Sequence, residues 1–327
     1  MRNQVKTFIA LLALGVMILP QGLMAQVASP SLDPTRAVIA PGAVAWKTQG
    51  AIFGGVNEGT GKRQKDGSEQ FDFSTSVADA GITVPAYNAV FEASARSQSH
   101  KINLSSAYDG HLPARRSDSR INIAMGDQEM SALGLGYKQS DIAEYEDGTM
   151  PKIKRSVSKI SGGVSLRFGE SFYLGLGGNR ARQSSDNRVD LSWNEKYVGL
   201  GLKFGSPEGH QFRIEASSLD SNEAREAAAD VMLEAWHPSE KKNITEVEWA
   251  MGGLLFSYHG EKNTIGADYV DAEGLAVTEI ISYSDQAGVL WIPKEGMLLG
   301  FYFRNDKLEA DYEETVSNFQ IRTGFLF

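Results

Sequence analysis

Hydrophobic and polar residues alternate along most of the chain, a period of two that predicts β-strands with one apolar and one polar face. The clearest stretch folds as a hairpin around the three residues 169–171. In this hairpin Phe168 pairs with Phe172 and Leu166 with Leu174, so the apolar faces of the two strands coincide. A turn that brings both faces into register supports the strands on either side of it.

A second hairpin is predicted around the Gly and Pro residues of 205–209. Its register pairs Leu202 with Phe212 and Leu200 with Ile214, while charged residues occupy alternate positions of the second strand. Two independent stretches therefore favour the same antiparallel arrangement.

Three local signals interrupt the alternation. Asn305-Asp306 predicts a two-residue turn, Gly252-Gly253 a bulge within a strand, and Glu223–Asp230 a short helix. Further strand-like segments are Gly50–Val56, Gln70–Ser76, Ala89–Arg96, Lys101–Tyr108, Ser119–Gly126, Ser131–Gln139, Val189–Trp193, Asp230–Trp236, Val247–Tyr258, Asn263–Val270 and Val277–Trp291. The chain is therefore predicted to be nearly all β.

Composition narrows the class of protein. The 327 residues are enough to bury a large core, so the chain needs no disulfide or zinc site for stability and the absence of cysteine is no obstacle to folding. A net charge of −9 argues against a nucleic-acid binder. The mean hydropathy of −0.27 and the lack of a long apolar run after Ala25 exclude a helical membrane protein.

The N-terminus reads as an export signal. Basic residues precede an uncharged stretch with an apolar centre over 7–20, and small residues follow up to Ala25. This pattern predicts a secretory signal peptide over 1–25, because a membrane anchor would need about 20 apolar residues. Residues 26–48 are then an N-terminal periplasmic or plug-like segment, and residues 49–327 form the β domain.

An all-β chain with two unlike faces is either a soluble sandwich or a membrane barrel. The chain ends in a strand that finishes at Phe327, and an uncovered aromatic edge is an aggregation hazard in a sandwich. This ending resembles the C-terminal signal of Gram-negative outer-membrane β-barrel proteins. The residues that carry the resemblance, and would form the assembly signal, are Phe319, Ile321, Phe325 and Phe327.

The resemblance implies a single transmembrane antiparallel β-barrel in the outer membrane, delivered by periplasmic chaperones and inserted by the barrel-assembly machinery. At roughly 20 to 22 residues per strand with its connector, the chain suits 14 strands, with 12 or 16 as alternatives. With Phe327 on the periplasmic side, long loops fall outside at Ser140–Arg155, Asn179–Arg188 and Leu219–Ala229.

The sequence offers little catalytic chemistry. None of its five histidines lies in a recognised catalytic or metal motif, so we expect no enzyme and no cofactor. What remains is a polar face that would line a lumen. Its candidate charges are Arg96, Arg167, Lys203, Arg213, Glu215, Asp268, Glu309, Asp311 and Arg322, together with Glu92 and Lys307. They form either a mutually paired lining or a charged constriction.

Two further groups of residues face the surroundings of a barrel. Arg115, Arg116, Lys152 and Lys154 fall in connectors assigned to the outside and are candidates for contact with lipopolysaccharide phosphates, the alternative being solvated loops. Candidates for interfacial aromatic girdles are Trp46, Trp193, Trp236, Trp249, Trp291, Tyr302 and Tyr312.

A second resemblance suggests a function. The Pro-containing segment 40–46 and the segment 191–201 are similar to elements of the long-chain fatty-acid transporter (FadL-like) family, although Ala40 and Gly42 depart from that family's Asn-Pro-Ala element. The resemblance implies passage of a small solute, including a hydrophobic compound. The alternatives are a structural or adhesin-like barrel that transports nothing, and a secreted soluble β-protein.

Overall fold

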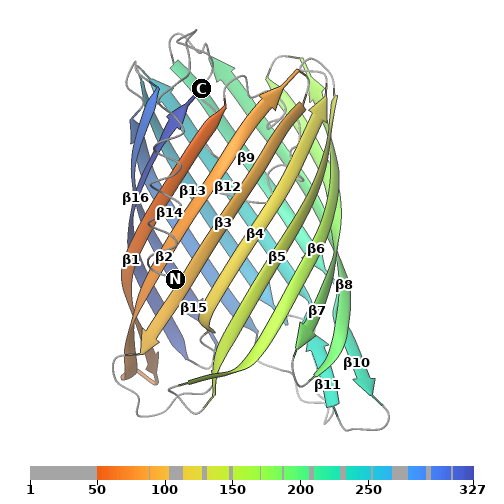
Figure 1. Cartoon of the computed structure of the whole chain (residues 1–327), viewed down its shortest axis with the longest axis vertical. Helices are drawn as coiled ribbons and strands as arrows, with labels where there is room; N and C mark the ends of the chain where they lie inside the picture. The colour runs from red at the N-terminus through yellow and green to blue at the C-terminus, as the bar shows by residue number, and fades with distance from the viewer. Residues whose placement is uncertain are drawn as a thin grey trace.

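The chain forms a closed antiparallel β-barrel (Figure 1). The computed structural model describes residues 50–87, 89–102, 113–126, 131–146, 150–169, 171–185, 188–205, 210–228, 233–251, 253–266, 279–291, 296–310 and 312–327. The expected signal peptide and the segment 26–48 lie outside these residues. Within the described residues no helix is both long and apolar enough to cross a membrane.

Fourteen strands close the barrel in the ring order β1-β16-β15-β14-β13-β12-β9-β8-β7-β6-β5-β4-β3-β2, and β10 and β11 form a separate hairpin. This confirms the expected fold class and strand number. The strands are β1 (Ala51–Lys65), β2 (Ser68–Ala86), β3 (Ala89–Ile102), β4 (Pro113–Gly126), β5 (Ser131–Glu146), β6 (Met150–Phe168), β7 (Phe172–Ser185), β8 (Arg188–Gly205), β9 (His210–Ser221), β10 (Ala224–Ala228), β11 (Leu233–His237), β12 (Glu240–Met251), β13 (Leu254–Ile265), β14 (Ile280–Trp291), β15 (Met297–Glu309) and β16 (Glu313–Leu326).

The two ends of the barrel differ in their connectors. We call the end at Phe327 the C-terminal mouth and the opposite end the far mouth. At the C-terminal mouth no connector is longer than the five residues 292–296. The far mouth carries the long connections 266–279 and 222–239, the latter with the β10–β11 hairpin (Figure 1). Short turns at one end and long loops at the other are typical of outer-membrane barrels.

The predicted register holds for one hairpin and fails for the other. Phe168 pairs with Phe172 and Leu166 with Leu174, as expected. Across the turn after β8, however, Leu202 pairs with Ile214 and not with Phe212. The shift is two residues, which preserves the apolar face and is therefore invisible to the alternation pattern.

Other local predictions were also wrong. Asn305-Asp306 lies inside β15, and the chain turns after it, where the Ala310 amide donates to the Tyr312 carbonyl. The expected helix at Glu223–Asp230 contains β10, because its residues pair with β11. The expected bulge in Val247–Tyr258 is the turn between β12 and β13.

Val189–Trp193 is not a strand of its own, because β8 continues through it to Gly205. The expected long loops at Ser140–Arg155 and Asn179–Arg188 are also mostly strand, since only 147–149 and 186–187 separate the strands there. The segment Gly50–Val56 is confirmed as part of β1, which pairs with both β2 and β16.

The outer face carries an apolar band next to the C-terminal mouth. On β8 the outward residues are apolar from Val198 to Phe204 and polar from Asp190 to Lys196. On β16 the outward, exposed residues Phe319, Ile321 and Phe325 lie in the same band. Beyond this band the wall continues toward the far mouth with a polar outer face, so the strands are longer than the apolar band requires.

The aromatic candidates divide between the two faces. Trp249 and Trp291 are exposed on the outside, whereas Trp193, Tyr302 and Tyr312 are buried and are not part of an outer girdle.

The barrel closes where the first strand meets the last. The Gly50 and Phe327 backbones exchange two hydrogen bonds at 2.9 and 3.0 Å. At the far mouth the Arg63 Nε donates to Glu314 Oε1 at 2.6 Å, and the Arg63 side chain is fully buried between the rings of Phe71 and Tyr312. We call this β16–β1–β2 region the seam.

Several inward glycines are covered by an aromatic ring from the directly opposite residue of the next strand. Gly201 lies opposite Tyr173, and a Cβ built on Gly201 would come within 2.1 Å of the ring. Gly288 lies opposite Tyr302 in the same way. The glycines thus let aromatic rings lie flat against the inner wall.

Candidate functional site

A cavity of about 630 Å³ occupies the interior of the barrel. All fourteen barrel strands contribute residues to its lining, and His237 of β11 joins them at the far mouth. The volume falls in the range of pockets that bind small molecules, about 300–1,000 Å³. The candidate functional site is therefore the lumen.

The inward face contains most of the charged residues that the sequence singled out. Alternation along each strand places these residues on the inner face: Glu92, Arg96, Arg167, Lys203, Arg213, Glu215 and Arg322. Asp268 and Asp311 lie outside the described residues.

Glu309 is not a lumen residue. It shares the outward face of β15 with Phe301 and Phe303, and its side chain is 40% exposed. Lys307 lies on the same outer face and bonds both Glu309 at 2.7 Å and Glu313 at 3.2 Å. The false turn at Asn305-Asp306 caused this error, because it reversed the faces assigned to the residues after it.

Arg213 is the centre of an acidic cluster on β9 and β12. Its guanidinium lies 3.4 Å from Glu215, 3.1 Å from Glu246 and 2.8 Å from Glu248. The Tyr173 hydroxyl also donates to Glu215 at 2.6 Å. All these side chains are at most 17% exposed. One guanidinium thus contacts three largely buried carboxylates, of which Glu246 also lies 3.2 Å from His259 Nδ1.

Two carboxylates on the other side of the lumen are each held by neighbouring cations. Asp79 accepts from Arg322 Nη2 at 2.5 Å. Asp118 accepts from Arg116 Nε at 3.0 Å and from the Ser140 hydroxyl at 2.6 Å, and Lys138 lies 3.8 Å away. These carboxylates are therefore fully engaged by charged or polar donors.

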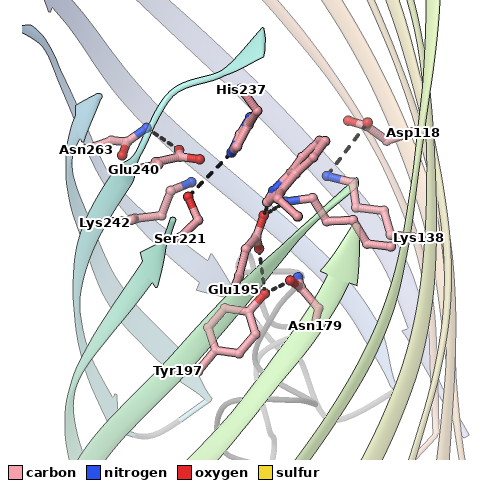
Figure 2. A network of polar contacts seen from close by, with 12 residues as sticks. Asp118, Lys138, Asn179, Glu195, Tyr197, Ser221, His237, Glu240, Lys242 and Asn263 are labelled. Atoms are coloured by element: carbon pink, nitrogen blue, oxygen red, sulfur yellow. Dashed lines mark hydrogen bonds and ion pairs between the residues drawn. The ribbon is translucent and has the colours of Figure 1, made fainter. Parts of the chain in front are cut away.

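A polar network lines the wall of the lumen on β6 to β8 (Figure 2). The fully buried Glu195 carboxylate accepts from Lys159 Nζ at 2.5 Å, Trp193 Nε1 at 2.9 Å and the Tyr197 hydroxyl at 3.1 Å. The Asn179 amide in turn donates to the Tyr197 hydroxyl. Three donors on one carboxylate fix this part of the wall, as buried polar groups require.

The β10–β11 hairpin docks on this network. The His237 ring stacks on Trp193 with centroids 3.9 Å apart, and its Nε2 lies 3.4 Å from the Ser221 hydroxyl (Figure 2). Ala224 of β10 packs on the apolar cluster of Ala181 and Leu191. The hairpin thereby covers the inner face of β7 and β8 at the far mouth.

Protonation of His237 should loosen the hairpin. Burial lowers the pKa of His237, and the nearby Lys159 and Arg155 lower it further, against the opposing effect of Glu240 and Glu195. The docked state thus favours neutral imidazole. Its stabilisation is present above the ordinary histidine pKa of about 6.5 and is lost as the pH falls below it.

We expect hydrogen exchange of the hairpin amides to rise several-fold between pH 7 and pH 5, after correction for intrinsic exchange. The control is His237→Phe, which keeps a stacking ring but cannot titrate, so its corrected exchange should be independent of pH. An equal rise in His237→Phe would assign the effect to other groups.

Apolar residues line the inner wall close to the C-terminal mouth. Val90, Ala124 and Ala132 form one cluster, each at most 3% exposed. A second cluster, on β13, β14 and β15, consists of Leu255, Leu290 and Leu298. The interior is thus polar in its cavity and apolar toward one end.

The four basic candidates for lipopolysaccharide contact separate by face. Arg115 and Lys154 are exposed on the outer side, beyond the apolar band. Arg116 is wrong as an outer-surface candidate, because it lies on β4, lines the cavity and bonds Asp118. Lys152 lies on β6, and its side chain is outside the described set.

Sequence reasoning missed several lumen residues, among them Asp79, Asp118, Lys138 and Glu195. Lys138 could have been found, since it alternates with the outward Leu135 and Tyr137 on a predicted strand. Asp118 lay just before the predicted start of its strand, because β4 begins earlier, at Pro113.

Neither a family model nor a curated protein sequence matches the chain. Solved structures do. The TodX deltaS2S3 mutant monoaromatic hydrocarbon channel matches with a TM-score of 0.55 at 9% identity, over 89% of this chain and 94% of that one. A Pseudomonas aeruginosa FadL homologue matches with a TM-score of 0.55 at 8% identity, over 90% and 94%.

The Ralstonia pickettii toluene transporter TbuX matches with a TM-score of 0.50 at 8% identity, again over 90% and 94%. At such identities the shared property is the fold. The chain therefore has the barrel fold of outer-membrane channels of the FadL and hydrocarbon type.

Proposed function

We propose that the protein is an outer-membrane channel through which a small solute crosses the barrel. The observation that carries this proposal is the cavity of about 630 Å³, which residues from every barrel strand line. A barrel that served only as an anchor would gain stability by filling this space with packed side chains.

We further propose that the solute has an apolar body. Apolar side chains such as Ile82 and Val157 and aromatic rings such as Phe53 and Tyr197 line the cavity and offer it apolar contacts. The neighbours in fold that are described as hydrocarbon channels and a toluene transporter favour the same solute class.

The test uses the full-length folded barrel in planar bilayers and in solute-loaded liposomes. We expect channel steps and entry of a monoaromatic compound. Ser161→Trp, which places a bulky ring in the cavity, should lower both, whereas Ser158→Trp on the outer face of the same strand should leave them unchanged. Absence of steps and uptake would favour the structural or adhesin-like barrel.

We infer that the C-terminal mouth faces the periplasm, because its connectors are short. The outward Phe319, Ile321, Phe325 and Phe327 would then be exposed to the barrel-assembly machinery and chaperones before β16 closes the barrel. The polar outer wall beyond the apolar band would stand outside the cell.

That wall carries a basic surface suited to lipopolysaccharide phosphates. Arg115, Lys154, Arg180 and Lys196 are exposed on β4, β6, β7 and β8, just beyond the apolar band. Replacing these four residues with Ala should reduce the lipopolysaccharide that co-purifies by at least twofold, since each loses a charge-assisted contact. Arg116→Ala is the control, because Arg116 follows Arg115 on β4 but points inward. An equal loss of lipopolysaccharide in both variants would contradict the assignment.

A further inference from the structure

Arg96 on β3 stands apart from the other lumen cations. It lines the cavity, yet among the described residues no carboxylate lies within ion-pair distance of it, and its Nε, like that of Arg322, has no hydrogen-bond partner. By contrast, Arg322, Arg116, Arg213 and Lys159 each bond a carboxylate directly. Burying a guanidinium without a partner is unfavourable unless something else supplies the acceptor.

The strand register would allow Arg96 to pair with a carboxylate on either neighbouring strand. Arg96 lies directly between Asp79 on β2 and Asp118 on β4. Asp79 instead accepts from Arg322 on β16, across Gly55 of β1, which lies between them in register. A Cβ on Gly55 would come within 2.4 Å of Asp79 Oδ1, so the glycine leaves the room for this longer reach.

Asp118 likewise accepts from other donors, Arg116 on its own strand and Ser140 on β5. Both carboxylates that flank Arg96 are thus occupied by other donors. The positive charge of Arg96 remains available to the cavity.

The charges that line the cavity are also distributed unevenly, with an excess of cations on the part of the wall that contains Arg96. From β15 through β16 to β6, the described cavity-lining residues include eight Arg and Lys and three carboxylates: Arg96, Arg116, Arg120, Lys138, Arg155, Lys159, Arg304 and Arg322, with Asp79, Glu92 and Asp118. On β7 to β14 they include three carboxylates, Glu195, Glu240 and Glu261, and one lysine, Lys242. One half of the wall is basic and the other is acidic.

We propose that Arg96 is the anion-binding residue of the lumen, and that it takes the carboxylate of a small organic monoanion. The planar guanidinium fork matches a carboxylate. The acidic half of the wall disfavours a second negative charge on the far side of the same solute. The proposal deepens the proposed channel function, since it names the charged group of the solute.

The test measures binding separately from transport. We expect the folded full-length barrel in detergent to bind benzoate saturably, and its neutral isostere benzamide far more weakly. Arg96→Gln should weaken benzoate binding at least tenfold, because the charge and the fork are both lost. The matched control is Lys242→Gln, which removes another cavity-lining cation, one that already bonds Glu261 at 2.9 Å; the benzoate affinity of this variant should differ less than twofold from wild type.

Two results would overturn the assignment: equal benzoate affinity in Arg96→Gln and wild type, or an equal loss in both variants. If Arg96→Gln fails to fold, Arg96→Lys, which keeps the charge but not the fork, should weaken benzoate binding several-fold. Benzoate binding without channel steps would support the site and refute transport. Channel steps without benzoate binding would support transport and refute the Arg96 site.

Discussion

Replacing Arg213 with Met is expected to lower the free energy of unfolding by about 3–5 kcal/mol, because the removal of one partner leaves buried charges uncompensated. In this chain the effect concerns three carboxylates, Glu215, Glu246 and Glu248, which all contact this guanidinium. Urea unfolding of the barrel in lipid vesicles, followed by tryptophan fluorescence, measures the loss as a lower midpoint.

The control keeps the Arg213→Met substitution and also removes the negative charge of two of the carboxylates. Combining Arg213→Met with Glu246→Gln and Glu248→Gln should recover at least half of the lost stability, since two of the three carboxylates become neutral. A triple variant as unstable as Arg213→Met would mean that packing of the Arg213 side chain, and not its charge, holds this part of the wall.

Gly201→Leu is expected to destabilise the barrel by about 3 kcal/mol. The new side chain would occupy the place of the Tyr173 ring, since even its Cβ would lie within 2.1 Å of that ring. Overpacking costs about 1–3 kcal/mol, and loss of the 2.6 Å hydrogen bond that Tyr173 donates to the charged Glu215 carboxylate costs about 1.5–3 kcal/mol more. A displaced ring would also enter the lumen and lower channel conductance.

The same urea midpoints test this prediction, with Gly162→Ala as its control. Gly162 faces outward, and a Cβ there would have its nearest neighbour at an ordinary 3.7 Å, so we expect a change within about 0.5 kcal/mol. An unchanged midpoint in Gly201→Leu would show that the Tyr173 ring can move without loss.

The alternation of the sequence was sufficient to predict an all-β chain. The C-terminal strand and its resemblance then favoured a barrel over a sandwich, and the chain length gave the strand number. The alternation failed where the barrel wall leaves the apolar band. On β15 the outward residues change from Phe301 and Phe303 to Asn305 and Lys307 while the strand continues. The apolar Leu308 then faces inward, so the pattern appears to reverse and imitates a turn. At Glu223–Asp230 helix propensity was overridden by pairing with β11, as tertiary context often does.

For the candidate site, the sequence could assign faces but not partners. Strand parity places Arg96, Arg213 and Arg322 inside, because the side-chain period of two is a property of each strand alone. Pairing depends on which strands meet after closure. Arg322 bonds Asp79, which is 243 residues away in the sequence, and a local pattern cannot predict such a pair.

The seam has a consequence for the order of assembly. Arg322 on β16 and Asp79 on β2 lie on either side of β1, so their ion pair can form only after β1 has been inserted between them. Arg63 and Glu314 unite the first and last strands in the same way at the far mouth. Opening the seam would strip a partner from buried charges at two heights at once, which raises the barrier to opening. The β1–β16 junction that closes the barrel is thereby expected to open slowly.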